Sequence, residues 1–222
     1  MSVHLDIALQ RLKKSLLELA AFVEDQVRQS LIAFNTRNDE VGKEVIAKDN
    51  QIDQIEIDIE ENCLQILALY QPVAQDLRFV ISVLKINNDL ERIGDLAVNI
   101  AERASALCAQ APVQEPLVSE AMEQRVLNML TSCIDCFVRS DINVAKSVCR
   151  SDLEIDKAHQ ANYRRLEELI AKSPHMTEIL LQHLSLSRYL ERIADLATNI
   201  AEDVIYLAEG KIVRHRQRFE VK

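Results

Sequence analysis

The chain has 222 residues, of which 48% are hydrophobic and only 4% aromatic, with three glycines, four prolines and no tryptophan. So few turn-forming and strand-favouring residues predict an all-α fold. The 26 basic and 35 acidic side chains give a net charge of -9, which argues against a general nucleic-acid binder because such proteins need a basic surface.

Three long helices are predicted in the first half of the chain. Apolar residues recur at three- and four-residue spacing over residues 3–34, which is the pattern of an amphipathic helix. The polar residues 35–39 interrupt this pattern, and a second helix is expected from Val41 to about Tyr70. Pro72 is expected in the first turn of a third helix that continues to Leu107.

The second half repeats this plan after a short linker. Residues 110–118 hold two of the four prolines and no helical pattern, so they are interpreted as the linker. Three further helices are expected, through 126–137, over about 143–171, and from the Ser173-Pro174 turn to Gly210. The six long helices then form two tandem three-helix bundles, repeat 1 over residues 1–109 and repeat 2 over residues 119–210. The tail, residues 211–222, carries five Lys or Arg and one acid, and is expected to be a basic arm or to dock on an acidic surface.

An internal repeat supports this division. The segment LERIGDLAVNIAE at 90–102 returns as LERIADLATNIAE at 190–202, with eleven of thirteen positions identical. The second helix of each half also carries the pattern D-x-x-I-D, as Asp49 to Asp53 and, 103 residues later, as Asp152 to Asp156. On a helix these acids fall on one face and the apolar residues on the opposite face.

Each repeat therefore has two helices that can bring four carboxylates side by side. Like charges four residues apart destabilise a helix by roughly 0.2–0.5 kcal/mol per pair, and the neighbouring Arg92 and Arg192 are expected to lie on a different face. Either solvent and salt absorb this cost, or a bound cation with oxygen ligands, such as Mg, Ca, Mn, Fe or Zn, offsets the repulsion. His159 offers a nitrogen ligand in the second repeat only. The candidate ligands are Asp49, Asp53, Glu91, Asp95, Asn99 and Glu102 in the first repeat, and Asp152, Asp156, Glu191, Asp195, Asn199 and Glu202 in the second.

The sequence also bears on two other function classes, enzymes and metal-free adaptors. The sequence has no phosphate-binding loop, no nucleophile elbow and no H-E-x-x-H motif, so no enzyme activity is predicted. A helical adaptor that uses its acidic faces for protein docking without metal remains the alternative. Cys133 and Cys136 form a C-x-x-C pair beside an apolar stripe, and they are interpreted as packed helix cysteines rather than as a metal site. Neither a signal peptide nor a membrane-spanning apolar run is apparent, so a cytoplasmic protein is expected.

The doubled LERI-D-A-NIAE segments, each preceded by D-x-x-I-D, closely resemble the PhoU family of phosphate-specific transport system accessory proteins. Asp76-Leu77-Arg78 and Glu209-Gly210-Lys211 extend the resemblance to about residues 3–212. It implies two tandem three-helix bundles and multinuclear iron or zinc clusters held by E/D-x-x-x-D pairs. The implied ligands are Asp49, Asp53, Glu91 and Asp95, and then Asp152, Asp156, Glu191 and Asp195.

The resemblance also implies a regulatory role. PhoU-like proteins act as negative regulators of phosphate uptake and of the phosphate-starvation response, linking the Pst transporter, through its ATPase PstB, to the sensor kinase PhoR. A homodimer is a further expectation from the family. The chain departs from many relatives at Leu196, where they carry a histidine, and this departure implies a weaker or differently built second site.

Overall fold

Six long α-helices make up nearly all of the computed structural model, which describes residues 3–108, 110 and 117–211. No strand occurs within these ranges, so the prediction of an all-α fold is confirmed. No helix in the described part of the chain is both long and apolar enough to cross a membrane. The helices are α1 (Val3–Thr36), α2 (Asp39–Tyr70), α3 (Ala74–Leu107), α4 (Glu120–Arg139), α5 (Ile142–Lys172) and α6 (Thr177–Glu209), with a 3-10 turn, η1 (Pro174–Met176), before α6.

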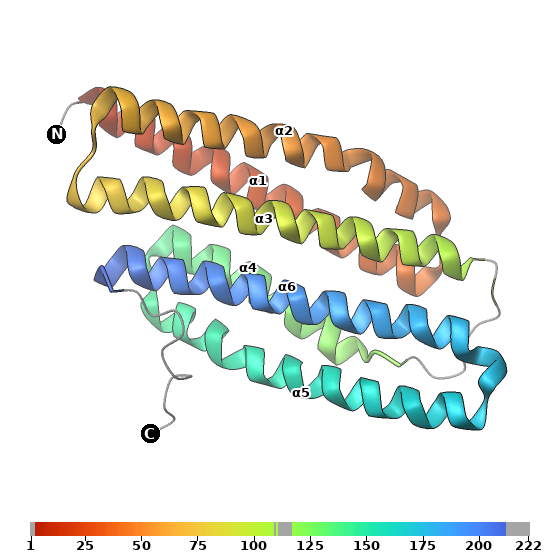
Figure 1. Cartoon of the computed structure of the whole chain (residues 1–222). Helices are drawn as coiled ribbons and strands as arrows, with labels where there is room; N and C mark the ends of the chain where they lie inside the picture. The colour runs from red at the N-terminus through yellow and green to blue at the C-terminus, as the bar shows by residue number, and fades with distance from the viewer. Residues whose placement is uncertain (1–2, 109, 111–116, 212–222) are drawn as a thin grey trace, which may run out of the picture.

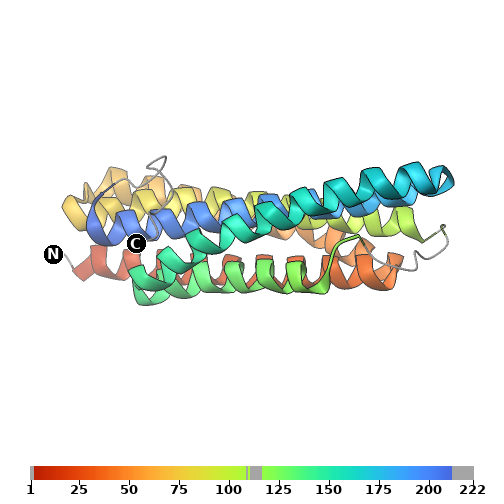
Figure 2. The same cartoon turned by 90° about the horizontal axis from the view of Figure 1, so that it is seen from below.

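The helices form two antiparallel bundles that lie lengthwise against each other (Figure 1). The first bundle contains α1, α2 and α3, and the second contains α4, α5 and α6. Their main interface is between α3 and α6, and a smaller contact joins α1 to α4, as the view in Figure 2 also shows. Buried side chains from both bundles belong to one continuous apolar cluster. The bundles are thus held together by a shared core, while the boundaries at 109 and 119 stay predictions.

The internal repeat extends to the backbone of the loops. Arg37 and Ser140 occupy equivalent positions, and both have a left-handed backbone, with φ of 53° and 54°. The next residues, Asn38 and Asp141, cap α2 and α5, because each side chain accepts hydrogen bonds from two backbone N–H groups of the first turn. The same turn and cap therefore orient the acidic helix of each repeat.

The start of α3 differs from the prediction. Pro72 was expected inside its first turn, but the helix begins at Ala74 and Val73 is its N-cap residue. Val73 is extended, with φ of -125° and ψ of 161°, because the chain must reverse between α2 and α3 before a helix can start. The predicted linker, residues 110–118, lies partly outside the described residues, and residues 212–222 of the predicted tail lie wholly outside them.

The C-x-x-C pair lies inside the second bundle. Cys133 and Cys136 are both buried, and their thiols donate to the backbone carbonyls of Leu130 and Cys133, each at 3.0 Å. Burial raises the pKa of the Cys136 thiol to about 12, so this side chain stays protonated at neutral pH. Both side chains therefore behave as the packed helix cysteines that the sequence predicted.

Candidate functional site

In the first repeat, close helix packing brings the predicted acids of α2 and α3 together. Ile52 of α2 is fully buried against Gly94 of α3, where a Cβ atom would lie only 2.8 Å from the Ile52 Cδ1 atom. Asp53 follows Ile52 directly, and Asp95 follows Gly94. The small glycine thus lets the two helices approach closely beside the carboxylates.

These carboxylates raise one another's pKa. Burial raises the pKa of Asp49 most, and the charges of Asp53 and Asp95 raise it further. The pKa of Glu91 is also raised by burial, and then by Asp95, Glu56, Asp53 and Asp49. The Oδ1 atom of Asp49 is buried and has no hydrogen-bond partner within the described part of the chain. The group is therefore an uncompensated cluster of negative charge with a buried oxygen that a cation can satisfy.

In the second repeat, three of the predicted carboxylates converge more tightly. Asp152 and Asp156 of α5 and Asp195 of α6 each offer an oxygen atom, and these atoms all lie within 4.8 Å of one another. Burial, then Asp195 and Asp156, raise the pKa of the neighbouring Glu191, while Arg188 and Arg192 oppose that rise. Among the described residues, Asp152, Asp156 and Asp195 are the one acidic group with oxygens this close together. The second repeat therefore has the more compact candidate site, although Leu196 stands where many relatives carry a histidine.

The remaining predicted ligands have other contacts. Asn99 donates its side-chain amide to the backbone carbonyl of Asp95 at 2.7 Å. Glu102 is exposed and pairs with Arg103 at 3.6 Å. Asn199 lines a cavity between α3 and α6. Glu202 is half-buried, and its charge adds to the effect of burial, which is the main cause that raises the pKa of the nearby Cys149 thiol to about 12.

The cavity between α3 and α6 is built from the two copies of the repeated segment. It has a volume of about 250 Å³, and the same four positions of each copy line it. The prediction that Arg92 and Arg192 lie on a different face from the acids is wrong, because the packing of α3 on α6 turns both arginines into this cavity with Asp95 and Asp195. Its lining residues are Arg92, Asp95, Leu96 and Asn99 of α3 and Arg192, Asp195, Leu196 and Asn199 of α6.

Sequence reasoning missed a polar pair next to each acidic group. In the first repeat, the amide of the buried Asn87 donates to the carbonyl of Glu56 at 2.9 Å and to its Oε1 atom at 3.2 Å. The equivalent positions of the second repeat hold His159 and Ser187, with His159 Nδ1 and Ser187 Oγ 2.9 Å apart. The repeat offset of 103 residues leads from Glu56 to His159, and the offset of 100 residues leads from Asn87 to Ser187. The two sites therefore differ, with an acid beside the first and an imidazole beside the second.

These donors suit a cation that prefers oxygen or mixed oxygen and nitrogen ligands. In the second repeat, Asp152, Asp156 and Asp195 offer three carboxylates at bridging distance, and Glu191 lies beside them. In the first repeat, the four acids and the buried Asp49 oxygen offer the same chemistry in a more open arrangement. The carboxylate groups of both repeats thus have the chemistry that a metal site needs.

Comparison with known proteins shows the family. The model of the PhoU domain matches residues 16–104 and again residues 120–204. A phosphate-specific transport system accessory protein PhoU homolog of Aquifex aeolicus is 36% identical over 208 residues, 94% of each chain. A PhoU homolog of Pseudomonas putida is 37% identical over 215 residues, 96% of this chain and 84% of that one.

Solved structures are similar over nearly the whole chain. The crystal structure of PhoU from Pseudomonas aeruginosa has a TM-score of 0.90 and 36% identity, and the alignment covers 93% of this chain and 99% of that one. The phosphate transport system regulatory protein PhoU from Streptococcus pneumoniae has a TM-score of 0.86 and 32% identity, over 94% and 99% of the two chains. The similarity thus covers both repeats and the packing between them.

Proposed function

The chain belongs to the PhoU family, and from this premise we propose that it is an accessory and regulatory protein of phosphate transport. The observation that supports this proposal best is that both repeats match the PhoU domain. Relatives that carry the name of phosphate-specific transport system accessory proteins align over nearly the full chain. The role is therefore regulatory rather than catalytic.

The chain acts as a negative regulator of phosphate uptake and of the phosphate-starvation response. It does so by contact with two partners on the cytoplasmic side of the membrane, a PstB-like transporter ATPase and a PhoR-like histidine kinase, and it works as a homodimer. The net charge of -9 and the lack of a phosphate-binding loop motif in the sequence support this account. Such a protein has to sense the phosphate supply through its partners.

Metal ions, iron or zinc, bind the acidic groups of the two repeats. Asp152, Asp156 and Asp195 hold the metal in the second repeat, with Glu191 beside them. Asp49, Asp53, Glu91 and Asp95 hold it in the first. When bound, the metal supplies positive charge that offsets the carboxylate repulsion and ties α2 to α3 and α5 to α6.

A metal-free adaptor is the second candidate. Asp53, Asp95 and Asp195 are exposed, so their carboxylates are accessible to basic groups of a partner protein. In that case the acidic faces are docking surfaces, and their mutual repulsion is relieved when the partner binds. Cation dependence of stability, which the adaptor lacks, separates the two candidates.

A strain that lacks the chain tests the proposed function. We expect phosphate-starvation genes to stay expressed and phosphate uptake to stay high in phosphate-rich medium, because the negative regulator is missing. The measurement is a reporter of a starvation-induced promoter together with uptake of labelled phosphate. Restoring the wild-type chain should restore repression, and normal repression in the strain without the chain would count against the proposal.

A further inference from the structure

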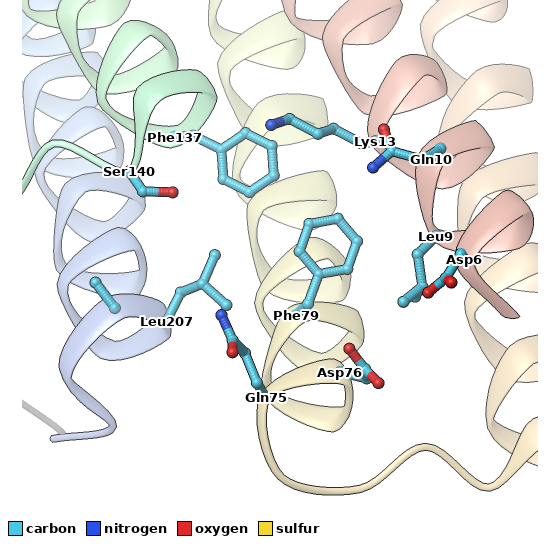
Figure 3. A pocket seen from close by; sticks show the side chains of 11 residues that line it. Asp6, Leu9, Gln10, Lys13, Gln75, Asp76, Phe79, Phe137, Ser140 and Leu207 are labelled. Atoms are coloured by element: carbon cyan, nitrogen blue, oxygen red, sulfur yellow. The ribbon is translucent and has the colours of Figure 1, made fainter. Parts of the chain in front are cut away.

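A second cavity lies where the amino-terminal parts of α1 and α3 meet the carboxyl-terminal ends of α4 and α6 (Figure 3). Its volume is about 390 Å³. Phe79 of α3 and Phe137 of α4 stack in it, with ring centroids 6.1 Å apart and planes inclined by 20°. Leu9 and Leu207 complete an apolar floor to which both repeats contribute.

The rim of this cavity carries negative charge without a matching cation. Asp6 and Asp76 both line the cavity, and neither has an ion-pair partner within the described part of the chain. Lys13 is the cation among the lining residues, but its Nζ donates to the Val138 carbonyl at 3.2 Å and lies 5.8 Å from the centroid of the Phe137 ring. The cavity therefore suits a ligand that combines an apolar side chain with positive charge.

The chain itself supplies such a ligand at this point. Helix α6 ends at Glu209, only two residues after Leu207, and Gly210 follows in a left-handed conformation with φ of 68°. The tail beyond it, residues 211–222, reads KIVRHRQRFEVK, with five basic residues, one acid and a single aromatic ring at Phe219. Phe219 is the ninth residue after Gly210, so the intervening chain reaches about 30 Å when extended. Phe219 can thus reach any part of the cavity from its wall.

We propose that the tail, residues 211–222, docks in this cavity of its own chain, with Phe219 on the Phe79 and Phe137 rings and its arginines on Asp6 and Asp76. Charge complementarity and the exit of the chain beside the cavity favour the tail of the same molecule over a second copy or another protein. The docked tail covers an apolar groove between the repeats and links the end of α6 to α1, α3 and α4. It also keeps other apolar, basic segments out of the groove.

Phe219→Trp tests this proposal, because the chain has no tryptophan and the new indole is then the sole reporter. In the docked tail the indole is shielded, so its emission shifts to shorter wavelength and its quenching by acrylamide falls by about twofold or more. Tyr163→Trp, at a 50% exposed position of α5 outside the cavity, serves as the exposed reference. Fluorescence is recorded over a range of protein concentrations.

The second variant adds Asp6→Lys and Asp76→Lys to Phe219→Trp. These positions are not in the buried core, so circular dichroism should show an unchanged helical fold. We expect the charge reversal to release the tail and bring emission and quenching to the level of the Tyr163→Trp reference. The proposal is overturned if the indole of Phe219→Trp is already exposed to solvent. It is also overturned if the indole is shielded and stays shielded after Asp6→Lys and Asp76→Lys. Shielding that appears only as protein concentration rises also overturns it, in favour of a second copy as the occupant.

Discussion

Addition of iron, zinc or manganese to metal-free protein is expected to raise the midpoint of thermal unfolding, and Asp195→Asn should remove most of that rise. Asp195 provides one of the three oxygens that lie within 4.8 Å of one another in the second repeat. At a cation concentration about 100-fold above Kd, binding stabilises the native state by about 2.7 kcal/mol. For a chain of this length, such a gain corresponds to a shift of about 5–10 °C.

The same substitution should have the opposite effect in chelator. Without a cation, removal of one charge relieves repulsion, so the stability of Asp195→Asn should be unchanged or higher by a few tenths of a kcal/mol. Asp95→Asn is the matched variant in the first repeat, where the acids are more open, and its loss of metal-induced stabilisation should be the smaller one. If no cation stabilises wild type more than it stabilises the variants, the acidic faces are docking surfaces and the adaptor account replaces the metal account.

A fall in pH from 7 to 4 is expected to cost about 3 kcal/mol of folding stability through His183 alone. His183 of α6 is only 7% exposed, and neither ring nitrogen has a hydrogen-bond partner within the described residues. It packs edge-on against Phe34 of α1, with ring centroids 5.2 Å apart. Burial, and then the charge of Arg37, lower its pKa from 6.5 to about 4.

The direction of the effect follows from these two pKa values. Because the folded-state pKa lies below the unfolded-state pKa, the unfolded chain binds the proton first as the pH falls. The stability contribution is therefore complete above pH 6.5 and is lost between pH 6.5 and 4. One pKa unit corresponds to about 1.4 kcal/mol, which gives the expected total.

His183→Phe isolates this effect from the other titrating groups. The substitution keeps an aromatic ring against Phe34 and removes the two unpartnered nitrogens, so it should also raise stability at pH 7 by about 1–2 kcal/mol. Urea unfolding of both proteins at pH 7 and 4.5 gives the comparison, with the exposed His175→Gln as control. Equal pH dependence of wild type and His183→Phe would show that His183 is not buried as the structure has it.

Much of the fold was predictable from the sequence because it depends on local pattern. Apolar periodicity predicted the six helices, and the repeat from 90–102 to 190–202 predicted equivalent bundles. Prediction from the sequence failed where packing between the two bundles, and not the local pattern, determines the structure. The side of α3 that faces α6 could not be predicted, because a helix can turn part of its polar face toward another bundle, as Arg92 and Asp95 do where they line the cavity against α6.

The candidate site was predictable in composition but not in geometry. The acids at 49, 53, 152 and 156 followed from the repeated D-x-x-I-D pattern. Their relative spacing depends on how the two helices pack, which the pattern does not give, and only the acids of the second repeat, among the described residues, have oxygens within 4.8 Å of one another. Burial of His183 was also not predictable, since it requires the contact between α1 and α6 across the two bundles.

One measurement tests most directly whether the two acidic groups carry the regulatory role. A strain that lacks the chain, with a reporter of phosphate-starvation genes, receives wild type, the double variant Asp95→Asn with Asp195→Asn, or the control Glu61→Gln with Glu167→Gln. The control removes the same charge from exposed positions of α2 and α5. In phosphate-rich medium, wild type and control should repress the reporter, and the double variant, present at the same level, should leave it active. Full repression by the double variant would contradict the account.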